Sequence, residues 1–121
     1  RLMGIVEPQR KILREISSRF LEMEPHGVDN YCCGGGSGFA IMNSMNFPDW
    51  KTSVAGRMKV MQILETFKDA LDPSIKKYVC TPCSNCKGQM RDLFDHYGLQ
   101  ERYNIFYTGL AELIANAMAN E

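Results

Sequence analysis

The sequence predicts an α/β fold, in which a small parallel sheet is flanked by helices. Apolar residues recur at helical spacing in several segments, and short runs of β-branched and aromatic residues lie between these segments. Such alternation is typical of layered α/β folds, because parallel strands are joined by crossovers that are usually helices. The chain has 121 residues, enough for one domain with its own core, so we treat residues 1–121 as a single domain.

The first helix is predicted to begin at Pro8, because proline is tolerated at the first helical position. Its apolar residues recur at roughly helical spacing: Ile12, Leu13, Ile16 and Phe20. Residues 20–23 are then predicted to form a short strand, which Pro25 and Gly27 end.

A second, long helix is predicted to begin at Pro48 and to end near Asp72 and Pro73. Gly56 weakens this helix slightly. Its apolar stripe is expected to face the core and contains Trp50, Val54, Met58, Met61, Leu64 and Leu71.

Residues 77–80 are predicted to form a strand, and a helix is expected to start between Cys83 and Asn85. Gly98 is its predicted stop, because glycine favours the conformation that ends a helix. The apolar face of this helix contains Met90, Leu93, Phe94 and Tyr97.

Another strand is predicted at residues 104–107, and Thr108 is the expected N-cap of a last helix. The apolar stripe of that helix contains Leu110, Leu113, Ile114 and Met118. Ligands of parallel sheets sit beyond the carboxyl ends of the strands, which is where Cys80 and Cys83 fall.

All five cysteines lie in two short segments, Cys32-Cys33 and Cys80/Cys83/Cys86, a spacing typical of a thiolate-ligated metal site. A vicinal pair can hardly direct both sulfurs at one small ion with tetrahedral geometry, but it can offer them to two neighbouring irons. The pattern therefore favours an iron–sulfur cluster over zinc. The odd cysteine count argues against a secreted disulfide scaffold and favours reduced ligands in a cytoplasmic setting.

The surroundings of these cysteines favour anionic sulfur. Cys83 and Cys86 share one face at a predicted helix start, where free N–H groups stabilise a thiolate. Gly34, Gly35 and Gly36 allow close backbone approach, so that their N–H groups can turn toward sulfur around the cofactor. Two alternatives remain for these glycines: a flexible turn, or a phosphate-binding loop that lacks the usual Gly-Lys-Ser/Thr ending.

Cys80 has two interpretations. With Cys83 and Cys86 it completes a C-x-x-C-x-x-C pattern and offers a third ligand in that segment. It also closes a strand, where cysteine is a common small apolar core residue, and we slightly prefer this second role.

Charge and hydropathy exclude several function classes. Lys and Arg total 14, as do Asp and Glu, so nothing indicates nucleic acid or an anionic membrane surface as a partner. No apolar run approaches the ~20 residues that span a bilayer, and no secretory leader is visible.

Two motifs resemble those of the cysteine-rich CCG domain family, which includes the catalytic subunit of heterodisulfide reductase. They are Tyr31-Cys32-Cys33-Gly34-Gly35-Gly36 and Thr81-Pro82-Cys83-Ser84-Asn85-Cys86. The wider segments 30–42, 46–50 and 83–89 resemble the DsrK-type branch, the heterodisulfide-reductase-like subunit of the membrane complex linked to dissimilatory sulfite reductase. The resemblance covers nearly the whole chain.

This resemblance implies a noncubane 4Fe-4S cofactor of fused units, held by five cysteines. Cys32 and Cys33 match the vicinal ligand pair, and Cys83 and Cys86 match the downstream pair. The fifth ligand is expected upstream of residue 1, which makes the chain the C-terminal part of a longer protein; Cys80 is a hypothetical substitute.

The implied activity is the reductive cleavage of a disulfide or trisulfide carried by a small partner protein. The electrons are expected from a membrane quinol-linked complex, through its cytochrome subunit. The implied location is therefore the cytoplasm, peripheral to the inner membrane through that complex.

Two other functions remain open from the residues alone. Four cysteines can close a structural zinc site in a module for protein contacts. Cys83 and Cys86 can instead act without metal in thiol–disulfide exchange, although this leaves the Cys32-Cys33 pair unexplained.

Overall fold

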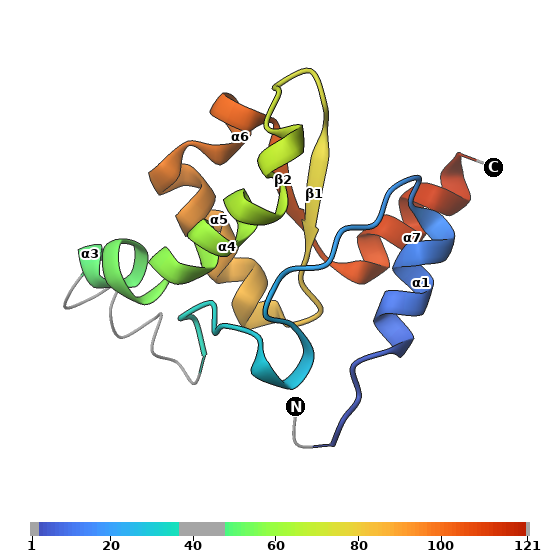
Figure 1. Ribbon diagram of the computed structural model, residues 1–121, viewed down its shortest axis with the longest axis horizontal. Helices are drawn as coiled ribbons and strands as arrows, with labels where there is room; N and C mark the ends of the chain where they lie inside the picture. Colours follow the sequence, from blue (N-terminus) through green and yellow to red (C-terminus); the bar gives the residue numbers. More distant parts are fainter. Residues whose placement is uncertain (1–2, 37–47, 121) are drawn as a thin grey trace.

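Helices surround a two-stranded parallel sheet in the computed structural model, which describes residues 3–36 and 48–120 (Figure 1). The α/β prediction is therefore confirmed. The elements, in order, are α1 (Pro8–Ile16), η1 (Gly27–Asp29), α3 (Pro48–Trp50), the π-helical segment η2 (Lys51–Ala55), α4 (Arg57–Thr66), η3 (Lys68–Ala70), β1 (Lys77–Cys80), α5 (Ser84–Tyr97), α6 (Leu99–Tyr103), β2 (Ile105–Thr108) and α7 (Leu110–Ala119).

The sheet pairs β1 with β2, and the register runs from Lys77 opposite Ile105 to Cys80 opposite Thr108. The Thr81 N–H extends the ladder by donating to the Thr108 carbonyl at 2.9 Å. Helices α5 and α6 form the crossover, and α5 and α7 each begin just after a strand ends. The carboxyl ends of both strands therefore meet at one edge, beside the N-termini of two helices.

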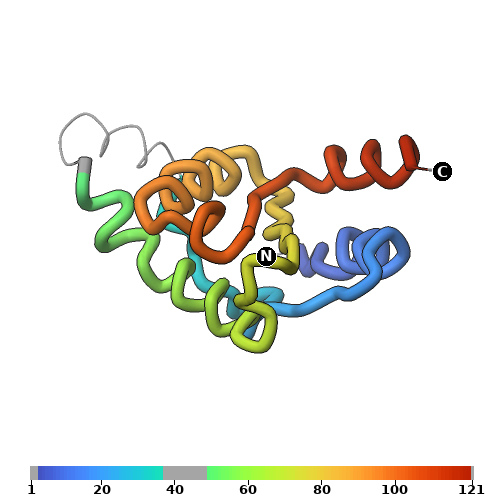
Figure 2. The backbone as a smooth tube through the Cα atoms, turned by 90° about the horizontal axis from the view of Figure 1, so that it is seen from above, coloured from blue at the N-terminus to red at the C-terminus, as the bar shows by residue number. Residues whose placement is uncertain are grey.

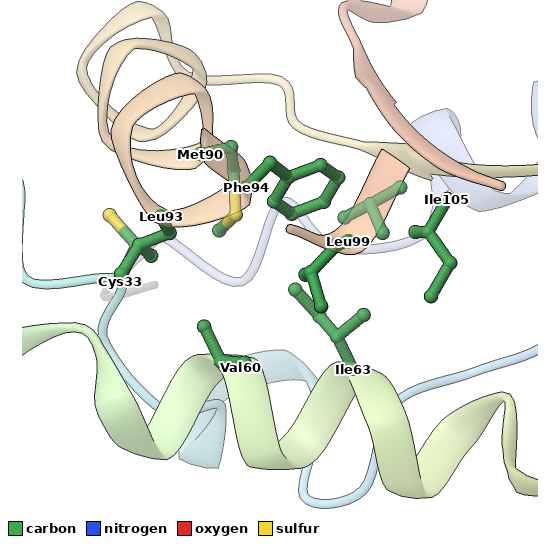
Figure 3. Packing of buried hydrophobic residues seen from close by; sticks show 9 residues of the cluster. Cys33, Val60, Ile63, Met90, Leu93, Phe94, Leu99 and Ile105 are labelled. Atoms are coloured by element: carbon green, nitrogen blue, oxygen red, sulfur yellow. The ribbon is translucent and has the colours of Figure 1, made fainter. Parts of the chain in front are cut away.

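The core lies between α4, α5 and the sheet (Figure 3). Val60 and Ile63 project from α4 toward Leu93 and Phe94 of α5, as Figure 3 shows. The other buried members of this cluster are Cys33, Val79, Met90, Leu99 and Ile105. The predicted apolar face of α5 is thus confirmed for Met90, Leu93 and Phe94, while Tyr97 is partly buried against the same cluster.

The predicted buried face of the second helix is wrong at four of its six positions, whereas Leu64 and Leu71 pack against the core as expected. Helix formation from Pro48 is confirmed, but Trp50, Val54, Met58 and Met61 are about half exposed. The buried side is instead centred on Gly56, where an added Cβ would lie only 2.4 Å from Leu93 Cδ2. Because Gly56 allows α5 to approach this closely, the helix face that contains Gly56 turns inward. The opposite face, which carries the four exposed residues, turns outward. The inward face contains Thr52, Lys59, Val60 and Ile63.

The strand predicted at residues 20–23 is also wrong, since these residues lie outside the sheet. A side-chain ion pair holds this segment: Arg10 Nε of α1 lies 2.6 Å from Glu22 Oε2. Helix α1 packs against α7, and Figures 1 and 2 both show the two helices side by side. Residues 20–23 are therefore held beside α1 and do not pair with the strands of the sheet.

At the C-terminal side, Gly98 adopts a left-handed conformation with φ of 64° and ends α5, as predicted. The sequence did not predict the short helix α6. Thr108 is not the N-cap of α7, because it is the last residue of β2 and Gly109 holds the cap position. The Thr108 hydroxyl instead donates to Glu112 Oε2 at 2.8 Å.

Candidate metal centre

The two cysteine segments converge. Cys33 lies on the loop that follows η1, and Cys86 lies in the first turn of α5. Their Sγ atoms are 3.0 Å apart although 53 positions separate the residues. The Cys33 side chain is buried, and in Figure 3 it points toward α5. The structure thus places one thiol of the vicinal pair directly against one thiol of the downstream pair.

Close packing accounts for two of the three glycines. At Gly34, φ is +84°, and an added Cβ would lie 2.7 Å from the Ala55 carbonyl oxygen. At Gly35, an added Cβ would lie 2.8 Å from Gln89 Cβ of α5. Any larger residue at either position would push the loop away from η2 or α5. An added Cβ at Gly36 would meet no atom of residues 3–36 and 48–120 within 4 Å.

A backbone group of the same loop contacts sulfur. The Gly34 N–H donates to Cys32 Sγ at 3.3 Å, and the Gly35 N–H favours the ionised form of Cys33. These contacts are of the kind expected from the glycine-rich sequence. The rest of the resembling motif, beyond Gly36, lies outside the described residues.

The remaining cysteines surround this contact at different depths. Cys83 is exposed at the N-cap position of α5, and its thiol contributes to raising the pKa of Cys86. Cys32 is exposed next to Cys33. Cys80 is half-buried at the end of β1, where burial raises the pKa of its thiol. The structure therefore brings Cys33 and Cys86 into contact, with Cys83 close enough to affect the pKa of Cys86, while Cys80 is half-buried at the end of β1.

The hydrogen bond between the two contacting thiols shifts their pKa values in opposite directions. The hydrogen bond with Cys86 lowers the pKa of Cys33 to about 6, although burial acts in the opposite direction. The positive charge of Lys59 lowers it further. The same hydrogen bond is the largest cause that raises the pKa of Cys86, followed by burial. Ionisation of the pair is therefore favoured at Cys33 over Cys86.

These donors fit an iron–sulfur cluster. Thiolates are the usual ligands of its irons, and backbone N–H groups directed at sulfur tune such centres. Within the part of the chain that the structure describes, no group of three or more His, Cys, Asp or Glu side chains is arranged to hold a metal ion. Cys33 and Cys86 are in direct contact. Cys32 is adjacent to Cys33 in the sequence, and Cys83 lies at the start of the helix turn that contains Cys86.

Three polar residues near this centre were missed from the sequence. Lys59 is only 4% exposed, and its Nζ donates to Asn30 Oδ1 at 2.8 Å and to Gln62 Oε1. Gln62 Nε2 in turn donates to the Pro25 carbonyl at 2.8 Å. The available signal was the spacing of Gly56, Lys59, Val60 and Ile63 on one helix face, which hydrophobicity alone does not reveal.

A fourth missed residue is Gln89, which lies one turn after Cys86 and is only 1% exposed. Its Nε2 donates to the Lys51 carbonyl at 2.9 Å. Its Oε1 is buried and has no hydrogen-bond partner among the residues that the structure describes. Gln89 also forms the surface against which Gly35 packs, so it joins the loop to η2.

Fold and site together define a small α/β domain with a thiol centre between a glycine-rich loop and a helix start. Comparison with protein-family models gives a match to the cysteine-rich domain, CCG, over residues 5–91. The match covers well over half of the chain, so this chain belongs to the cysteine-rich CCG domain family. This family is typical of oxidoreductases of the heterodisulfide reductase type that carry iron–sulfur clusters.

Neither curated proteins nor solved structures gave a match to this chain. Among the described residues, no helix combines the length and apolar character that crossing a membrane requires.

Proposed function

We propose that this chain is the cluster-bearing part of a reductase that cleaves a disulfide or trisulfide on a small partner protein. The observation that carries the proposal is the 3.0 Å contact between Cys33 Sγ and Cys86 Sγ. It joins the two segments whose cysteines match the ligand pairs of the family, which a shared cofactor requires. The proposed ligands are Cys32, Cys33, Cys83 and Cys86, with a noncubane 4Fe-4S cluster as the cofactor.

The chain's own residues hold sulfur anions in place. The lowered pKa of Cys33 makes a thiolate available near neutral pH. The Gly34 N–H donates to Cys32 Sγ, and Cys83 lies at the N-cap position of α5, beside the free N–H groups of the helix start. The exposed position of Cys32 and Cys83 leaves one side of the centre open to a partner.

When bound, the cluster supplies the electrons. Cleavage of one disulfide takes two electrons and two protons and yields two thiols. We propose that the electrons come from a membrane quinol-linked complex through its cytochrome subunit, and that the chain works in the cytoplasm at the inner membrane. The resemblance to the DsrK-type branch supports this partner and this place.

Iron and acid-labile sulfide, measured together with visible and EPR spectra after anaerobic reconstitution, test the cofactor. We expect iron and sulfide in comparable amounts in the wild-type chain. Cys33→Ser and Cys86→Ser are each expected to lose most of both. Cys80→Ser is the matched control, because Cys80 is half-buried at the end of β1 and takes no part in the Cys33–Cys86 contact, and an unchanged spectrum would assign it no ligand role. Zinc alone, without colour, would replace the redox proposal with a structural zinc module.

A second function is favoured by the same contact. Two thiols 3.0 Å apart, one with a lowered pKa, are arranged for thiol–disulfide exchange without metal. The pair is then Cys33 and Cys86, in place of the Cys83 and Cys86 pair considered from the sequence. Exchange activity that persists in protein stripped of iron would support this alternative over the first proposal.

A further inference from the structure

Lys59 of α4 joins this helix to the segment that leads into the vicinal cysteines. Its Nζ donates to Asn30 Oδ1 at 2.8 Å, and Gln62 Nε2 donates to the same oxygen at 3.2 Å. The Asn30 backbone N–H donates to the Gly27 carbonyl at 3.4 Å. Asn30 is therefore held by both its side chain and its backbone, three residues before Cys33.

The lysine is deeply buried. Lys59 is 4% exposed and Gln62 is 5% exposed. Removing an ammonium group from water is costly, and a buried lysine often loses its proton for that reason. The hydrogen bonds to Asn30 and Gln62 offset part of that cost, and a nearby anion would offset more of it.

The thiol centre is such an anion. Val60, the next residue on α4, packs in the same buried cluster as Cys33, which places this turn of the helix against the cysteine loop. A positive charge on Lys59 would therefore act on sulfur anions held at the thiol centre. A low effective dielectric strengthens such an interaction, because water does not screen it fully.

We infer that Lys59 is a positioning residue of the thiol centre, which fixes the Asn30–Cys33 segment on α4 and directs a positive charge at the sulfur anions. This inference rests on the proposed function in its second part, since the anion is the thiolate-ligated cluster. A positive charge stabilises the more reduced and more negative state of such a cluster, and therefore raises its reduction potential.

Lys59→Met tests the inference, with Lys51→Met as the matched control. Lys51 is another buried lysine, 8% exposed, but its Nζ pairs with Asp92 of α5 instead of with a residue of the segment before the vicinal cysteines. Two quantities are measured in the 121-residue chain. One is the midpoint potential of the reconstituted cluster by EPR-monitored titration. The other is amide hydrogen exchange at residues 31–36 in the metal-free chain.

Lys59→Met is expected to shift the midpoint potential to a more negative value and to speed exchange in the cysteine loop. Lys51→Met is expected to change neither. Asn30→Ala removes only the tether, so it should speed exchange while leaving the potential near the wild-type value, and it stands in for Lys59→Met if that variant does not fold.

The outcomes separate this inference from the proposed function. A wild-type chain that takes up no iron–sulfur cluster overturns the function, while the exchange measurement still decides whether Lys59 positions the loop. A normal cluster whose potential is the same in Lys59→Met overturns the electrostatic role. Equal exchange rates in wild-type, Lys59→Met and Asn30→Ala chains overturn the positioning role.

Discussion

Cys33 Sγ and Cys86 Sγ lie 3.0 Å apart and connect the glycine-rich loop to the first turn of α5. The contact sits beside the place where Gly35 packs on Gln89, so backbone and sulfur approach α5 together. At this separation, only a small rotation of the two side chains would be needed to form a disulfide bond between the sulfurs. It therefore makes a specific prediction about the metal-free chain.

Mild oxidation of the metal-free chain with diamide is expected to give a Cys33–Cys86 disulfide. The Cys33 thiolate adds to the oxidant, and Cys86 displaces the adduct, which leaves a disulfide and the reduced hydrazine. Thiol–disulfide exchange then moves any initial linkage toward the pair that the fold holds closest. Peptide mapping by mass spectrometry identifies the linkage.

The control for this prediction is Cys86→Ser, which should leave Cys33 without an intramolecular partner of equal proximity. A dominant Cys83–Cys86 linkage in the wild-type chain after equilibration would contradict the observed geometry.

Two glycines on helices are expected to respond oppositely to alanine. An alanine Cβ at position 56 would lie 2.4 Å from Leu93 Cδ2, whereas one at position 88 within α5 meets no atom within 4 Å. Alanine gains up to about 1 kcal/mol over glycine in a helix, and overpacking costs about 1–3 kcal/mol. Gly56→Ala should therefore lower the free energy of unfolding and Gly88→Ala should raise it, as chemical denaturation would measure.

If Gly56→Ala is as stable as the wild-type chain, α4 and α5 do not approach each other as closely as described. Gly88→Ala provides the baseline for the intrinsic helix preference in the same comparison.

The orientation of α4 predicts a contrast between two residues only two positions apart. Ile63 is fully buried, at 0% exposed, while Met61 is 58% exposed. Ile63→Ala should lower the free energy of unfolding by about 2–5 kcal/mol, because it removes packed methyl groups and leaves a cavity. Met61→Ala should change it by less than about 0.5 kcal/mol. A large loss of unfolding free energy in Met61→Ala would show that Met61 is buried in the core, which would contradict the described orientation of α4.

The parts of the fold that depend on local signals were predictable. The strand from Lys77 to Cys80 and the end of α5 at Gly98 are where the sequence places them. Each has a local cause, namely a β-branched and aromatic run before Thr81-Pro82 in one case and glycine's left-handed conformation in the other. The grouping of the cysteines into two segments also follows from the sequence.

Other features depend on contacts between distant residues. Gly56 was interpreted as a weak point of a helix, but its missing side chain decides which helix face meets Leu93. Residues 20–23 have strand-like composition, yet Glu22 pairs with Arg10 and keeps them beside α1. The burial of Lys59 requires Asn30 and Gln62 to come together, which no period in the sequence reveals.

Glu112 links the two helices that start beyond the sheet, and its ionisation should affect stability at low pH. Its carboxylate pairs with Lys87 of α5 and accepts hydrogen bonds from the Gly109 N–H and the Thr108 hydroxyl. The Lys87 interaction, followed by these hydrogen bonds, lowers the pKa of Glu112 to about 2. The folded state therefore prefers the carboxylate more than the unfolded chain does, where the pKa is 4.5.

For a carboxyl group with a depressed pKa, the stabilisation is complete above the unfolded-state value of 4.5 and is lost as the pH falls through about 2. Glu112→Gln should thus be less stable than the wild-type chain near neutral pH. This difference in stability should shrink steadily as the pH falls from 4.5 to about 2. Glu15→Gln, at an exposed position of α1, is the control for the loss of one surface carboxyl group. Denaturation midpoints by circular dichroism measure both.

Because Glu112 is exposed, added salt should reduce the effect. A difference between Glu112→Gln and wild type that does not change with pH would show that the carboxylate is not held by Lys87 and the start of α7.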